Sequence, residues 1–273
     1  MLPALSQVCS LAAAFEKDIE DYAAGACRTI EVWLGKLETY LESHSIDDVR
    51  RLLDLHGVAA PVASFQGGLL DSQGEARREH WKLFARRLEL CRALGIGTLV
   101  VACDTVAPLD QTAIERVNVS LRDAAELAAQ HEVRLALEFQ ARAAWGNNLQ
   151  TAAALVDQRG HASLGLCLDA FHFFVGSSKS EDLGYLSQQN LFHVQLCDLS
   201  GVTRELAADA DRILPGDGDL PLAPLLAHLR NIDYEGCVSI ELMNPQIWQV
   251  PPRQFSEVGI TALRKLLGQA SMG

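Results

Sequence analysis

The sequence lacks the signatures of several common protein classes. Basic residues are outnumbered, with 23 Lys and Arg against 35 Asp and Glu and a net charge of −12. Because a protein that binds duplex DNA needs a basic surface to displace counterions, no nucleic-acid partner is expected. The chain contains no G-x-x-x-x-G-K-[ST] motif, and no G-x-G-x-x-G turn follows its first apolar run. The first absence excludes P-loop nucleotide enzymes.

Long apolar runs and paired cysteines are missing as well. No segment approaches the ~18 consecutive apolar residues of a membrane span, so no membrane partner is expected. Met1–Phe15 is fairly apolar, but no Lys or Arg precedes Lys17, so we interpret this segment as a first strand and helix rather than a signal peptide. The seven cysteines are odd in number and form no C-x-x-C pair. They are typical of buried core residues in a reducing compartment, which predicts a cytoplasmic protein.

What the sequence does contain is an alternation of short apolar runs and amphipathic stretches. The eight apolar runs are Ala4–Cys9, Thr29–Trp33, Ala59–Phe65, Thr98–Ala102, Arg134–Phe139, Leu164–Asp169, Leu191–Leu196 and Cys237–Leu242. Helical periodicity is clear at Ile46–Leu55, Glu75–Leu94, Thr112–His131, Leu222–Leu229 and Arg253–Leu267. Eight strand–helix repeats predict an α/β fold, a (β/α)8 TIM barrel in which residues 1–273 form one domain. A doubly wound open sheet is the alternative, but it usually has fewer strands and a glycine-rich first turn.

The last four runs each carry a polar side chain near the carboxyl end, where barrel enzymes place their active sites. These side chains are Glu138, Asp169, Gln195 and Glu241. In each run the residue two positions earlier is small or polar, whereas the alternate positions are aliphatic. Since side chains alternate along a strand, all four are expected to face the barrel axis.

Three carboxylates in one cluster repel one another unless a cation lies among them. We therefore predict one divalent metal ion with these four residues as ligands. An all-oxygen ligand set favours Mn²⁺ or Mg²⁺, with Co²⁺ or Zn²⁺ as alternatives.

Several longer motifs then point to a family. They are KLETYLESHSIDD at Lys36–Asp48, LALEF at Leu135–Phe139, GLCLDAFHF at Gly165–Phe173, DRILPGDGDLPL at Asp211–Leu222 and VSIELMNP at Val238–Pro245. With these motifs the chain resembles the sugar phosphate isomerase/epimerase superfamily of xylose isomerase-like TIM barrels. Within that superfamily it is most similar to the inosose (2-keto-myo-inositol) isomerases of bacterial inositol catabolism.

The resemblance implies roles for individual residues. It implies that Glu138, Asp169, Gln195 and Glu241 bind the metal ion. Inosose isomerases have His at the position of Gln195, whereas hydroxypyruvate isomerases and 3-dehydroshikimate dehydratases have Gln there. It also implies that His172 and Arg212 contact substrate oxygens. Glu138 and Glu241 are implied as catalytic residues that each move a proton at one face of the substrate.

The expected function is a metal-dependent isomerase or epimerase that acts on a sugar, keto-sugar or inosose through a metal-stabilised enediolate. A lyase of the 3-dehydroshikimate dehydratase type, a hydroxypyruvate isomerase, and a sugar-binding barrel without catalysis are the alternatives. A DNA-repair endonuclease on the same fold is rejected, since it needs a His-rich three-metal site and a basic groove. The expected partner is a small polyol or keto-sugar. Barrels of this family often form dimers or tetramers, and the sequence leaves the homo-oligomeric state open.

Overall fold

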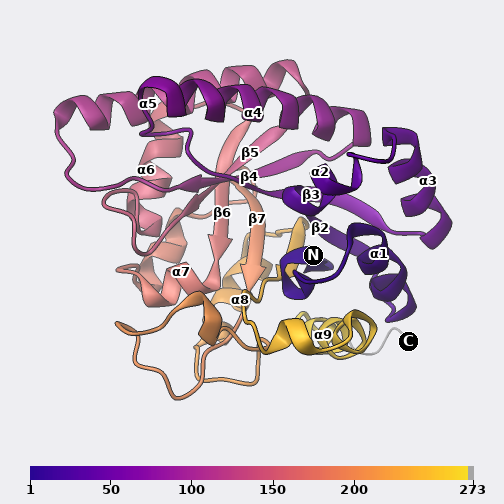
Figure 1. The fold of residues 1–273 in the computed structure, drawn as a ribbon. Coiled ribbons are helices and arrows are strands. Elements are labelled where there is room, and N and C mark those ends of the chain that lie inside the picture. Colours follow the sequence, from indigo (N-terminus) through magenta and orange to yellow (C-terminus); the bar gives the residue numbers. More distant parts are fainter. Residues whose placement is uncertain (270–273) are drawn as a thin grey trace. The chain divides into compact units, whose positions relative to one another are not determined.

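A computed structural model describes residues 1–269 of the chain (Figure 1). Its eight strands close into a barrel in the order β1 to β8, and the recorded neighbouring pairs are parallel. The strands are β1 (Leu2–Ser6), β2 (Thr29–Trp33), β3 (Ala59–Gln66), β4 (Thr98–Cys103), β5 (Arg134–Phe139), β6 (Leu164–Asp169), β7 (Leu191–Leu196) and β8 (Cys237–Ile240). The predicted (β/α)8 barrel is therefore confirmed.

Helices follow the strands throughout the part of the chain that the structure describes. The α-helices are α1 (Phe15–Ala24), α2 (Leu34–Tyr40), α3 (Ile46–His56), α4 (Gly74–Leu94), α5 (Gln111–Gln130), α6 (Leu149–Arg159), α7 (Ala170–Val175), α8 (Leu222–Asn231) and α9 (Pro252–Leu266). Short 3-10 helices cover Gln7–Ser10, Ser180–Tyr185, Asp209–Asp211 and Ile247–Gln249. The five helices expected from periodicity are all present, within about one residue at most ends.

Local capping chemistry explains where these helices begin and end. At the start of α3, the Ser45 hydroxyl accepts from the backbone N–H of Asp48, and the Asp48 carboxylate accepts from that of Ser45. This reciprocal pair satisfies two backbone donors that the first helical turn leaves without partners. Gly95 ends α4 with a φ of 71°, a left-handed conformation that glycine adopts without a steric penalty.

Four of the predicted strands have wrong limits. The strands β3 and β4 each extend one residue further than predicted, and β1 and β8 differ by two residues or more. The first strand ends at Ser6, not Cys9, because the next residues form a 3-10 helix whose Val8 N–H donates to the Ser6 hydroxyl. Val8 and Cys9 are buried in that helix, so their apolar character did not distinguish it from a strand. The eighth strand ends at Ile240, which leaves Glu241 directly beyond the carboxyl end of β8.

Two compact units divide the chain. Unit 1 contains Met1–Ala63 and the described residues from Val194 onward, and unit 2 contains Ser64–His193. Within unit 1, β1 pairs with β2 and β8, and α1 packs beside α9 (Figure 1). Within unit 2, β4, β5 and β6 are consecutive neighbours.

Both faces of these strands are buried, as parallel sheets require. All seven cysteines are buried and unbonded to one another, as the sequence predicted. Among residues 1–269, no helix is both long and apolar enough to cross a membrane.

Candidate active site

Strand register in unit 2 explains how two predicted ligands come to lie together. Glu138 on β5 is level with Ala102 on β4 and with Cys167 on β6. Asp169 lies two residues beyond Cys167 and is the last residue of β6. Because side chains alternate along a strand, Asp169 projects from the same face of the sheet as Cys167 and Glu138.

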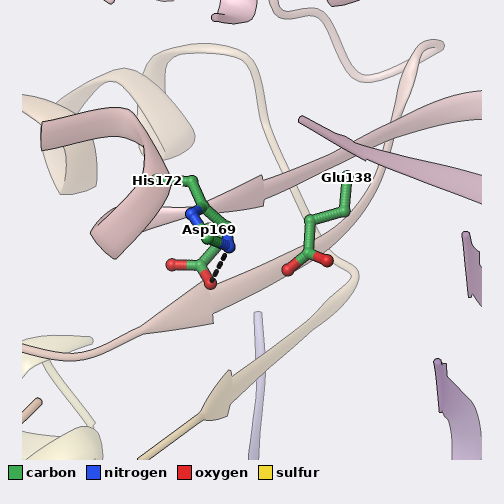
Figure 2. Close-up of side chains that lie close together, drawn as sticks. All are labelled: Glu138, Asp169 and His172. Atoms are coloured by element: carbon green, nitrogen blue, oxygen red, sulfur yellow. Dashed lines mark ion pairs between the residues drawn. The ribbon is translucent and has the colours of Figure 1, made fainter. Parts of the chain in front are cut away.

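The structure brings Glu138, Asp169 and His172 into one cluster. Figure 2 shows the two carboxylates directed toward each other, with the imidazole beside Asp169. One ligand atom from each of the three residues lies within 4.8 Å of the others. All three side chains are buried. His172 belongs to α7, which starts immediately after β6, so the short helix sets its position next to the strand end.

Local hydrogen bonds orient the two carboxylates. Oδ1 of Asp169 accepts from the backbone N–H of Phe171 at 2.6 Å, which caps the start of α7. The side-chain amide of Gln140 donates to Oε2 of Glu138. These bonds limit the rotamers of both carboxylates before any ligand arrives, and such pre-orientation is typical of functional sites.

One backbone contact indicates the tautomer of the neutral His172 ring. The N–H of Ala141 donates to Nδ1 of His172 at 3.3 Å. A ring nitrogen that accepts carries no proton, so the neutral imidazole carries its proton on Nε2. That nitrogen lies 3.9 Å from Oδ2 of Asp169. His172 therefore presents a donor, which suits contact with a substrate oxygen better than coordination of a cation.

In unit 1, the other two predicted ligands also contact each other. Gln195 on β7 is level with Ser239 on β8, and Glu241 lies two residues beyond Ser239. Nε2 of Gln195 donates to Oε1 of Glu241 at 2.9 Å. Nη1 of Arg212 donates to Oε2 of the same carboxylate, also at 2.9 Å. Both oxygens of Glu241 therefore accept from neighbouring side chains.

Arg212 is buried despite its position in the long loop after β7. Its Nε and Nη2 both donate to Oδ1 of Asp209, and its backbone oxygen accepts from the side chain of Asn244. A buried guanidinium needs charged partners, and Glu241 and Asp209 supply them. The structure thus shows Arg212 fixed against a predicted ligand. The predicted contact of Arg212 with substrate stays a prediction.

The buried Asp198 organises the same loop, although it was not among the predicted site residues. The carboxylate of Asp198 accepts from the backbone N–H groups of Leu199, Gly216 and Leu220, each at 2.9 Å. The backbones of Asp198 and Ile213 also bond to each other in both directions. This bridge places Arg212, the residue before Ile213, beside the carboxyl end of β7.

A second missed residue is Glu31 on β2. Its carboxylate is fully buried and accepts from Gln195 and Ser239. The run TIEVW alternates Thr29, Glu31 and Trp33 with two aliphatic residues. That is the same alternation that identified the last four strands, so it could have identified Glu31.

The predicted ligands suit a divalent cation by their chemistry. Unit 2 gathers two buried carboxylates, which repel each other and bind cations through oxygen. Unit 1 gathers the Gln195 amide and the Glu241 carboxylate, again an oxygen-rich set. Glu138 and Asp169 belong to unit 2, Gln195 and Glu241 to unit 1. Coordination of one ion by all four residues stays a prediction.

Unit 1 also contains a cavity of about 500 Å³ beyond the ends of β1 and β2. Its walls include Phe15, Trp33 and Lys36. Nζ of Lys36 donates to Asp18 and to the backbone oxygen of Ser10, so this amine is held within the wall. Burial raises the pKa of Asp18 to about 6, although the ammonium of Lys36 opposes that shift.

Comparison with known proteins identifies the family. A family model described as a xylose isomerase-like TIM barrel matches residues 20–266. The chain belongs to this family. The match covers most of the eight-stranded barrel, and it confirms the resemblance inferred from the motifs.

Individual relatives of this xylose isomerase-like barrel differ in activity. An inosose isomerase from Halalkalibacterium halodurans is 29% identical over 240 residues, which is 86% of this chain and 84% of the relative. A 3-dehydroshikimate dehydratase from Pseudomonas aeruginosa is 28% identical over 265 residues, 93% of this chain but only 40% of that longer protein. A solved structure described as IOLI protein with a binding zinc atom superposes with a TM-score of 0.92 at 22% identity, over the full length of both chains. At this identity, the structural similarity shows that the two proteins share a fold.

Proposed function

We propose that this protein is a divalent-metal-dependent isomerase or epimerase that acts on a keto-sugar or inosose. The observation that carries the proposal is the buried cluster of Glu138, Asp169 and His172 at the ends of β5 and β6, in a chain of the xylose isomerase-like family. A barrel places its catalytic groups at the carboxyl ends of its strands. The similarity to an inosose isomerase over most of both chains supports the substrate class.

The proposed metal ligands are Glu138, Asp169, Gln195 and Glu241. The zinc reported for the structural relative supports a metal in this family, while the oxygen donors of this chain favour Mn²⁺ or Mg²⁺. When bound, a divalent ion supplies Lewis acidity that stabilises negative charge on a substrate oxygen.

The chain's own residues then have distinct tasks in the proposed reaction. Glu138 and Glu241 each remove or return a proton at a carbon next to the substrate carbonyl. His172 donates a hydrogen bond from Nε2 to a substrate oxygen, consistent with its tautomer. Arg212 holds the Glu241 carboxylate in one orientation through Nη1. Epimerisation returns the proton to the same carbon on its other face. Isomerisation returns it to the former carbonyl carbon, while the neighbouring hydroxyl gives its proton to the former carbonyl oxygen.

A 3-dehydroshikimate dehydratase activity is the second candidate, and Gln195 favours it. The family resemblance implies glutamine at this position in such dehydratases, and a dehydratase is 28% identical across 93% of this chain. The initial proton removal would be the same. The outcome differs because the substrate then loses a β-hydroxyl as water instead of regaining a proton.

An assay of the purified protein with added Mn²⁺ separates the two activities. The substrates are 2-keto-myo-inositol, a set of ketoses, and 3-dehydroshikimate, each followed by chromatography and ultraviolet absorbance. We expect an isomeric keto product from an inosose or ketose, and none from Glu241→Gln. Consumption of dehydroshikimate with the rise of an aromatic catechol absorbance would replace the isomerase proposal with the lyase.

A further inference from the structure

Glu31 is a buried carboxylate that the proposed reaction does not use. It lies on β2 of unit 1 with none of its surface exposed to solvent. A carboxylate removed from water is costly unless it is held by hydrogen-bond donors or opposite charge. It is the central residue of β2 and is level with Ser6, the last residue of β1.

The donors that hold Glu31 come from β7, which carries Gln195, and from β8, which ends directly before Glu241. Nε2 of Gln195 donates to Oε1 of Glu31 at 2.9 Å. The hydroxyl of Ser239 on β8 donates to Oε2 of Glu31. Gln195 and Ser239 are directly opposite each other across β7 and β8, so both donors reach one carboxylate from adjacent strands.

The same Gln195 nitrogen donates to two carboxylates. One of its bonds goes to Glu31 and the other to Glu241, both at 2.9 Å. An amide nitrogen carries two hydrogens, and an ionised carboxylate only accepts. If the amide were reversed, its oxygen would face two acceptor oxygens. The two carboxylates therefore fix the orientation of the amide, with its nitrogen toward them and its oxygen away from them.

We propose that Glu31 is a positioning residue that orients the Gln195 amide so that Oε1 serves as the metal ligand. The inference rests on the proposed function, because it takes Gln195 as a ligand. Imidazole ligands of metal ions commonly donate their other ring N–H to a carboxylate. That hydrogen bond fixes the orientation of the ring and raises its basicity. Here the oriented group is an amide. Glu31 acts through Gln195 and does not touch the substrate.

Binding of Mn²⁺ measured by isothermal titration calorimetry, without substrate, tests this role. Glu31→Met removes the acceptor at similar volume, whereas Glu31→Gln keeps an acceptor oxygen but removes the charge. We expect Glu31→Met to weaken Mn²⁺ binding about 10- to 100-fold. Glu31→Gln is expected to recover most of that loss. The exposed Glu257→Gln variant, which changes the net charge by the same amount, is expected to bind like the wild type.

A double-mutant cycle with Gln195→Ala separates action through Gln195 from a direct effect of charge. We expect Glu31→Met to cause little further loss once Gln195 is alanine. An equal loss from Glu31→Met with and without Gln195, or equal losses from Glu31→Met and Glu31→Gln, would overturn the inference while leaving the metal site intact. A wild-type protein that binds no Mn²⁺ would overturn the proposed function and this inference together.

Circular dichroism and Tm check that each variant folds. If Glu31→Met fails to fold, Ser239→Ala gives the same information, because it removes the other donor that holds Glu31. We then expect weaker Mn²⁺ binding for Ser239→Ala, and no added weakening when it is combined with Gln195→Ala. An undiminished effect of Ser239→Ala in the Gln195→Ala protein would again overturn the role of Glu31.

Discussion

The backbone N–H of Ala141 donates to Nδ1 of His172, and this one bond determines which ring nitrogen carries the proton. With its proton on Nε2, His172 is expected to donate to substrate rather than to coordinate a cation. We therefore expect His172→Asn to lower kcat/KM by about 10²-fold. Mn²⁺ affinity, measured by calorimetry, is expected to stay near the wild-type value.

His44→Asn is a suitable control for that experiment, because His44 is an exposed histidine of unit 1. It is expected to change neither the rate nor the affinity. A large loss of Mn²⁺ affinity in His172→Asn would show instead that the imidazole coordinates the ion.

We expect the clustered carboxylates of unit 2 to make stability depend on the proposed metal. Without a cation, Glu138 and Asp169 repel each other, so we expect Glu138→Gln to stabilise the metal-free protein by on the order of 1 kcal/mol. That corresponds to a rise in Tm of roughly 2–4 °C. Mn²⁺ at 100 times its Kd is expected to stabilise the wild type by about 2.7 kcal/mol and the variant far less. Thermal unfolding with and without Mn²⁺ measures both effects. A Tm rise with Mn²⁺ that is the same in both proteins would contradict a ligand role for Glu138.

The identity of the residue at position 195 is expected to set metal preference. An amide oxygen is a hard ligand, whereas an imidazole nitrogen is softer and binds Zn²⁺ better. Gln195→His is expected to raise the ratio of Zn²⁺ to Mn²⁺ affinity by about tenfold or more. The exposed Gln249→His variant is the control, with an unchanged ratio expected. Competition calorimetry measures the ratio, and an unchanged value for Gln195→His would argue against coordination by this residue.

The buried pair of Asp18 and Lys36 predicts a specific pH dependence. Burial raises the pKa of Asp18 to about 6, above its ordinary value of 3.8, and it lowers the pKa of Lys36. Between pH 3.8 and pH 6, the pKa values of Asp18 in the unfolded and folded states, the folded state binds more protons than the unfolded state. The stabilising contribution of Asp18 is therefore complete below about pH 4 and is lost as the pH rises through 6.

Comparison with Asp18→Asn isolates this contribution. The free energy of unfolding of the wild type, relative to the variant, is expected to fall by on the order of 2 kcal/mol from pH 4 to pH 7. Urea denaturation across this range measures it. The exposed Asp54→Asn variant is expected to show no comparable trend. A relative stability of the wild type that rises with pH would contradict the raised pKa.

The barrel could be predicted because its strands are buried on both faces and therefore appear as apolar runs. Four of the eight strands have the predicted limits, and the alternation of polar and aliphatic residues identified Glu138 and Asp169 as neighbours. The end of β1 was missed because the buried Val8 and Cys9 pack in a 3-10 helix with the same apolar character.

The hydrogen-bond partners within the candidate site could not be predicted in the same way. Gln195 and Glu31 are 164 positions apart in the sequence. Only the folding of unit 1 brings Nε2 of Gln195 to 2.9 Å from Oε1 of Glu31. The tautomer of His172 depends on a backbone N–H in the loop after β5. Such contacts depend on loop and strand geometry, which residue patterns do not specify.

Proton exchange at carbon tests the central claim most directly. The purified protein with Mn²⁺ is incubated with 2-keto-myo-inositol in D₂O, and ¹H NMR follows the hydrogens next to the carbonyl. The proposed reaction predicts Mn²⁺-dependent exchange of deuterium into those positions, well above the rates of the metal-free protein and of Glu241→Gln. No exchange above these controls with this substrate, together with conversion of 3-dehydroshikimate to an aromatic product, would contradict the isomerase account.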